Sequence, residues 1–208
     1  MKKIVKRALS MICMLTLTTV SGMSVCASSD ADAKKAEYYK EYQAIIERLS
    51  GEAELEIGLL PAEEFAEEDW RSPEEFEQLV RELIHADIAS CDNEEVEGEL
   101  PLAARSSVTA SKSKSFTWGD SYNCTIKISA SFTTQYNSGR QYISSVSAIS
   151  SQKTSGVGTW TPNGSEYRLL DSDRTAQVTV SGKISYAGAY ITKIMSVEFY
   201  CNSNGGIS

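Results

Sequence analysis

The sequence predicts a mainly β protein in which an antiparallel β-sandwich is preceded by a short acidic α-helical segment. Apolar and polar side chains alternate over residues 122–133 and again over 176–201, which is the pattern of strands with one buried face. Glycine, asparagine, proline and aspartate separate such runs at hairpin spacing. The charge is also divided, because residues 28–105 hold 7 basic and 23 acidic side chains and residues 106–208 hold 9 and 5.

These observations divide the chain into four parts. We expect a signal peptide over residues 1–27, an acidic helical segment over 28–97, a linker over 98–114 and the β-sandwich over 115–208.

The first part has the three regions of a secretory signal peptide. Four basic residues open it, a short apolar run follows as far as Val20, and Val25-Cys26-Ala27 precedes Ser28. We therefore expect cleavage near Ala27 and a secreted protein. Lipid attachment at Cys26 is the alternative, and the bulky Val25 disfavours it. No later run approaches the length of a membrane span.

The acidic segment predicts two amphipathic helices. The apolar face of the first helix, which ends near Ser50-Gly51, consists of Tyr38, Tyr39, Tyr42, Ile45, Ile46 and Leu49. A packed face explains these tyrosines better than a binding face. The second helix begins at Ser72, since Pro73 and Glu75 complete a capping box, and its apolar stripe predicts that it reaches about Ser90.

Residues from Cys91 to Lys114 are first acidic and then rich in Ala, Ser, Thr and Lys, which predicts a linker. Arg105, where the sign of the charge changes, is a candidate processing site. The strands that follow are separated by turns at 137–139, 161–164 and 171–174, so six or seven strands build an Ig-like sandwich or a small barrel.

Three cysteines follow the predicted signal peptide: Cys91, Cys124 and Cys201. By alternation, Cys124 lies on the inward face of the first long strand and Cys201 on the inward face of the last. We predict a disulfide between them, because secretion supplies the oxidant, and we expect Cys91 to be unpaired. Two separate buried thiols are the alternative.

The segment LLDSDRTAQVTVSGKISYAG, taken with the upstream YISSV and the Trp-turn-Tyr hairpin, resembles small, uncharacterised secreted proteins of Gram-positive bacteria. The resemblance covers residues 115–208 and implies an extracellular, Ser/Thr-rich β domain. It brings no catalytic or binding motif.

The residue types argue against most chemistries. His85, the only histidine, falls on the polar face of its helix, so no catalytic triad or histidine metal site is expected. Asp171 and Asp173 share a turn, which they are expected to fix by hydrogen bonds. The basic residues after position 105 are dispersed, which does not fit a nucleic-acid surface. We therefore predict no catalytic residue, no metal and no cofactor.

The function predicted from these features is that of a secreted, non-enzymatic extracellular or cell-envelope interaction module. Its partner would be an unknown protein or a cell-envelope glycan, and the candidate contact residues are the aromatics Trp118, Trp160 and Tyr167. Core packing is the alternative role for these three side chains. The rival function is a membrane-active toxin or bacteriocin-like β domain kept inactive by the acidic segment, and the mass of the mature protein would distinguish the two.

Overall fold

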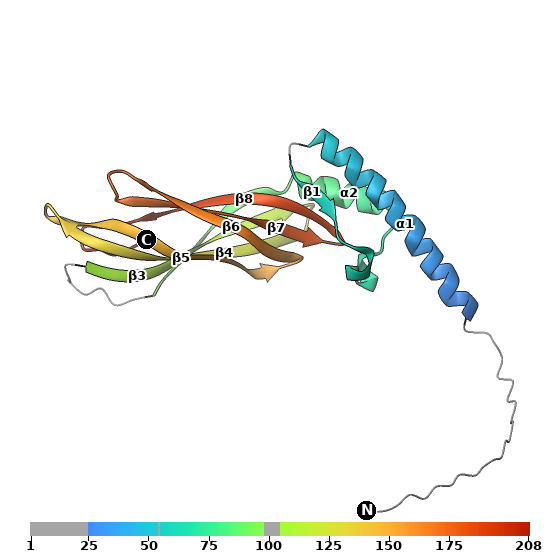
Figure 1. Ribbon diagram of the computed structural model, residues 1–208, viewed down its shortest axis with the longest axis horizontal. Helices are drawn as coiled ribbons and strands as arrows, with labels where there is room; N and C mark the ends of the chain where they lie inside the picture. Colours follow the sequence, from blue (N-terminus) through green and yellow to red (C-terminus); the bar gives the residue numbers. More distant parts are fainter. Residues whose placement is uncertain (1–24, 54, 98–104) are drawn as a thin grey trace, which may run out of the picture.

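The computed structural model describes residues 25–53, 55–97 and 105–208. Two four-stranded antiparallel sheets form the body of the molecule, with strand orders β1-β8-β7-β6 and β2-β3-β4-β5 (Figure 1). The mainly β class and the helical segment before the sheets are thus confirmed. The elements are α1 (Val25–Glu52), β1 (Ile57–Leu59), η1 (Ala62–Glu64), η2 (Glu67–Asp69), α2 (Pro73–Ile84), β2 (Asp87–Glu97), β3 (Arg105–Trp118), β4 (Tyr122–Asn137), β5 (Arg140–Gly156), β6 (Thr159–Leu170), β7 (Thr175–Tyr186) and β8 (Ala189–Tyr200).

The core lies between the two sheets and follows the alternation in the sequence. Every second residue of β4 is buried from Cys124 to Phe132, and the apolar residues of β7 and β8 are buried in the same way. The rings of Phe132 in one sheet and Phe199 in the other are 4.8 Å apart, centroid to centroid. This aromatic pair marks the place where the centre of β4 meets the end of β8.

The helices pack at one end of the sheets, and the N-terminal part of α1 extends beyond them (Figure 1). Tyr42 of α1 is fully buried against Phe76 of α2, with ring centroids 4.0 Å apart. The Tyr42 hydroxyl donates to the carbonyl oxygen of Arg71 at 2.6 Å and accepts from the Arg71 amide at 2.9 Å. The segment before α2 is therefore held to α1 through both the backbone carbonyl and the backbone amide of Arg71.

The start of α2 is confirmed, but its predicted end is wrong. The Ser72 side chain accepts from the Glu75 amide and the Glu75 carboxylate accepts from the Ser72 amide, as the capping box requires. The helix stops at Ile84, and β2 begins at Asp87 and pairs with β3. Hydrogen bonding to a neighbouring strand overrides the helical pattern after Ile84.

Residues 105–114, which the sequence places in a linker, form most of β3 and pair with β4 along its whole length. Lys112 and Lys114 lie opposite Ile128 and Ile126, so they occupy inner-face positions where the sequence pattern requires apolar residues. The Lys112 ammonium lies 5.7 Å from the centroid of the Phe199 ring. Long lysine side chains therefore cover apolar surface here, which hides the strand from a hydrophobicity pattern.

The predicted turn at 161–164 is also wrong. The register of β6 against β7 shifts between Pro162 and Gly164, and pairing continues on both sides of the shift. Proline and glycine here form a β-bulge inside one strand rather than a turn between two strands.

The predicted disulfide is not formed: Cys124 and Cys201 are free, and both are fully buried. Cys124 precedes Phe132 by eight residues on the same strand, or about 26 Å at the rise of a β-strand. Cys201 follows Phe199, the partner of Phe132, by two residues. The two cysteines thus share the core but lie toward opposite ends of it, far beyond the Cα separation of about 7 Å that a disulfide allows. Alternation predicts a shared face and leaves position along the strand undetermined.

Two other sequence predictions lie outside the described residues. The signal peptide falls on residues 1–24 except for its last three residues, which begin α1. The side chain of Cys91 in β2 is likewise outside the described part.

Candidate functional site

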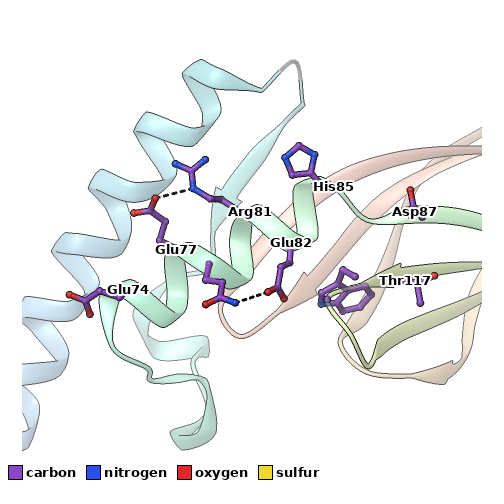
Figure 2. Close-up of a pocket in the computed structure, with 10 residues that line it drawn as sticks. Glu74, Glu77, Arg81, Glu82, His85, Asp87 and Thr117 are labelled. Atoms are coloured by element: carbon purple, nitrogen blue, oxygen red, sulfur yellow. Dashed lines mark hydrogen bonds and ion pairs between the residues drawn. The ribbon is translucent and has the colours of Figure 1, made fainter.

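A groove of about 610 Å³ lies between α2 and the end of β3, and we call it the α2 groove (Figure 2). One wall is the polar face of α2 and the residue after it. The other wall is the start of β2 and the end of β3. Its lining residues are Glu74, Glu77, Gln78, Arg81, Glu82, His85, Asp87, Thr117, Trp118 and Gly119.

The sequence of α2 fixes which side chains reach the groove. Its apolar stripe is buried against α1 and the sheets, and consists of Phe76, Leu79, Val80 and Leu83. Burial of this stripe turns the charged residues of the helix outward. At the C-terminal end of α2, the Lys193 ammonium donates to the carbonyl oxygen of Ile84 at 3.3 Å, which ties the helix to β8. The orientation of the acidic face is therefore set by contacts at both ends of α2.

The base of the groove is formed by Trp118, the last residue of β3. Its side chain is 2% exposed and packs against the rings of Tyr122 and Tyr186, with centroids 6.1 and 5.8 Å away. The indole N–H of Trp118 has no hydrogen-bond partner among the described residues. A buried donor without an acceptor costs about 1–3 kcal/mol of stability, so an acceptor supplied by a ligand would be favourable here.

Gly119 allows the turn after β3 to approach the helix. Its φ of +55° favours glycine, and a Cβ at this position would lie 2.6 Å from the Oε2 atom of Glu82. The Glu82 carboxylate also accepts from the side-chain amide of Gln78 at 2.9 Å. Glu82 is thus held beside the turn, at the Trp118 end of the groove.

The charges of the groove are only partly compensated. Glu77 and Arg81 form an ion pair at 3.0 Å on the side of α2 that faces α1, as Figure 2 shows, and Glu77 also pairs with Arg48. These two guanidinium groups lower the pKa of the Glu77 carboxyl below its ordinary value. By contrast, Glu74, Glu82 and Asp87 form no ion pair within the described part of the chain. Three carboxylates of the groove therefore have no ion-pair partner, and the Lys193 ammonium acts on Asp87 only without direct contact.

A second hollow of about 340 Å³ continues the acidic surface on the other side of Glu82. It shares Gln78 and Glu82 with the α2 groove, and its other lining residues are Arg71, Glu75, Leu79, Asp120, Ser121 and Tyr122. The Nε atom of Arg71 is buried and has no hydrogen-bond partner among the described residues. The two hollows together present six carboxylates and two guanidinium groups.

The carboxylates of the two hollows give this surface the chemistry to hold a cation. The residues that the structure describes contain no group of three or more His, Cys, Asp and Glu side chains placed to hold a metal ion. His85 caps the C-terminal end of α2 and is exposed, and Figure 2 shows it at the rim of the groove. An organic cation, such as a lysine or arginine side chain, fits the chemistry of the lining.

The three candidate aromatic residues lie in different places. Trp118 and Trp160, which the sequence suggests as exposed contacts, are buried in the core, as the core-packing alternative describes. Trp160 lies over Gly182 and donates from its indole to the Ser151 hydroxyl at 2.9 Å. Tyr167 is 44% exposed on β6, away from the α2 groove.

Of these three, only Trp118 reaches the groove. The acidic residues around it are missed by sequence reasoning, because glutamates on the polar face of a helix are indistinguishable from an ordinary solvated surface. The capping box and the stripe of α2 fix which residues face outward, but they carry no signal that the turn after Trp118 lies opposite.

Within the described residues, no helix has both the length and the apolar character needed to cross a membrane. No protein-family model, curated protein or solved structure matches the chain, so the chemistry of the α2 groove is interpreted from its own residues.

Proposed function

We propose that this protein is an exported, non-enzymatic interaction module that binds a cationic segment of a partner protein in the α2 groove. The observation that carries the proposal is that two deficits occur in one groove. Glu74, Glu82 and Asp87 line it without an ion-pair partner, and at its Glu82 end the buried indole N–H of Trp118 has no acceptor among the described residues.

A peptide segment corrects both deficits at once. A lysine or arginine side chain supplies the positive charge, and a backbone carbonyl supplies an acceptor for the indole N–H once binding displaces the side chains that cover it. Hydrogen bonds that involve a charged group are stronger than neutral ones, so the carboxylates contribute most of the affinity and Trp118 contributes to its specificity. Because the groove is open to solvent, salt is expected to weaken binding.

A glycan fits the groove less well. Sugars stack on the exposed face of an aromatic ring, and the ring of Trp118 is covered by Tyr122 and Tyr186. The described groove presents no other tryptophan and no tyrosine or phenylalanine side chain. Of the two kinds of partner that the sequence suggests, a protein with a basic segment is therefore the better match.

Isothermal titration with short peptides tests the proposal. A lysine-rich peptide with blocked ends should bind, and an acidic peptide of the same length should not. Glu82→Gln and Asp87→Asn should each weaken binding by about tenfold, the effect of one charge-assisted hydrogen bond. Glu198→Gln is the matched control, because Glu198 is exposed on β8 and lies outside the groove.

Trp118→Phe tests the second half of the proposal. It removes the unpaired donor and keeps an aromatic ring, so the free protein should lose little stability while peptide affinity falls. Equal binding of basic and acidic peptides, or equal loss of affinity in the groove variants and in Glu198→Gln, would refute the proposed function.

A further inference from the structure

We propose that two copies of this chain pair through β6, antiparallel and edge to edge, about a twofold axis at Tyr167. The proposal is independent of the α2 groove. It rests on the geometry of β6, which is the last strand of its sheet and pairs with β7 alone among the described strands.

The outer edge of β6 is open. Residues 161–168 are all exposed, and none of them takes part in a hydrogen bond outside the β6–β7 ladder in the described part of the chain. A row of unpaired backbone N–H and C=O groups is a template for another strand. Two of the large apolar side chains that stay exposed lie nearby: Tyr167 on β6 itself, and Ile194, which is 66% exposed and lies two strands away on β8.

The usable part of this edge has defined ends. On one side the bulge between Pro162 and Gly164 breaks the regular pairing, and on the other side the turn at 171–174 ends the strand. Residues 164–170 remain. A twofold axis perpendicular to the sheet pairs all seven with their copies only when it passes through the middle residue, Tyr167.

This register is also the one that the charges favour. Glu166 and Arg168 lie opposite Thr179 and Gln177 of β7, on the outer face of the sheet, and neither forms an ion pair among the described residues. An axis at Tyr167 places Glu166 directly opposite Arg168 of the second copy, and the reverse pair follows by symmetry. Moving the axis to residue 166 places Glu166 opposite itself, and moving it to residue 168 places Arg168 opposite itself. Both neighbouring registers thus bring like charges together.

In the same register, a side chain of the second copy lies beside a shallow hollow of the first. A hollow of about 200 Å³ lies on the outer face, lined by Gly164, Ser165, Glu166, Thr179, Ser181 and Ile194. Gly164 of β6 pairs with Ser181 of β7, which pairs with Ile194 of β8, so these three residues form one row across the sheet. Because Gly164 has no side chain, the hollow stays open at the β6 edge. An axis at Tyr167 places Leu170 of the second copy opposite Gly164, beside this hollow.

Sedimentation equilibrium at a series of protein concentrations tests the pairing. The wild type should show a reversible monomer–dimer equilibrium. Glu166→Arg alone or Arg168→Glu alone places like charges opposite each other twice per dimer, so each should raise the dissociation constant at least about tenfold. The double variant Glu166→Arg/Arg168→Glu restores both pairs and should return the constant toward the wild-type value.

Glu198→Arg, on the same face of the sheet but on β8, is the control for a general charge effect and should dimerise like the wild type. A wild type that is monomeric at every concentration overturns the proposal. So do single reversals that dimerise as well as the wild type, or a folded double variant that stays as weak as the single variants.

Discussion

Adding a reductant to the folded protein should leave its free energy of unfolding unchanged. The magnitude makes this a sharp test, because a bridge between Cys124 and Cys201 would close a loop of about 77 residues. The chain-entropy argument assigns such a loop about 4.5 kcal/mol. The structure places the two thiols toward opposite ends of the core, so the expected difference is zero.

The measurement is urea unfolding with and without tris(2-carboxyethyl)phosphine, in a Cys91→Ser background that removes the third thiol after the predicted leader. Burial raises the pKa of the Cys124 and Cys201 thiols, so both are protonated at neutral pH and should react slowly with iodoacetamide in the native state. In denaturant both should be alkylated without prior reduction. A fall of several kcal/mol on reduction, or an unfolded protein that resists alkylation until it is reduced, would show that the sheets are aligned differently.

Three further outcomes follow from single contacts. Burial lowers the pKa of the Lys193 ammonium, so at alkaline pH the unfolded state binds more protons than the folded state. The free energy of unfolding of the wild type, relative to that of Lys193→Met, should therefore rise as the pH increases toward about 10.5, the ordinary pKa of lysine. Urea unfolding at each pH measures it. Ser72→Ala removes the N-cap of α2 and should cost about 1 kcal/mol in the same assay. Gly182→Ala places a Cβ 2.4 Å from the Trp160 ring and should cost about 1–3 kcal/mol, whereas Gly164→Ala, whose Cβ meets nothing nearer than 3.5 Å, should be close to neutral by thermal melting.

The fold could be predicted where each residue's environment agrees with its type. In β4, β7 and β8 the inward positions are apolar, so alternation alone identifies the strands. β3 is different, because Lys112 and Lys114 stand at inward positions and their long aliphatic stems take the place of apolar side chains. No pattern of hydrophobicity finds such a strand.

The candidate site could be predicted only in part, because it depends on how distant segments meet. Alternation places Trp118 on the same face as Phe116, which already indicates burial, whereas an aromatic residue next to a turn suggests exposure. The α2 groove arises because α2 packs opposite the turn at Gly119. The local sequence of neither segment indicates this long-range contact. The cysteines show the same limit, since facing inward says nothing about distance along the core.

The positions of β1 and β2 bear on the rival idea of an acidic pro-segment. Each is the outermost strand of a different sheet, and both precede Arg105, the candidate processing site. Arg105 is the first residue of β3 and pairs with Gln135 of β4. Proteolysis after Arg105, followed by loss of the acidic half, would remove the edge strand of each sheet and leave the backbone hydrogen-bonding groups of β8 and β3 unpaired. The fragment released in this way would expose an unpaired strand edge on each sheet and would be prone to associate through those edges. The acidic half thus completes both sheets, with one edge strand in each.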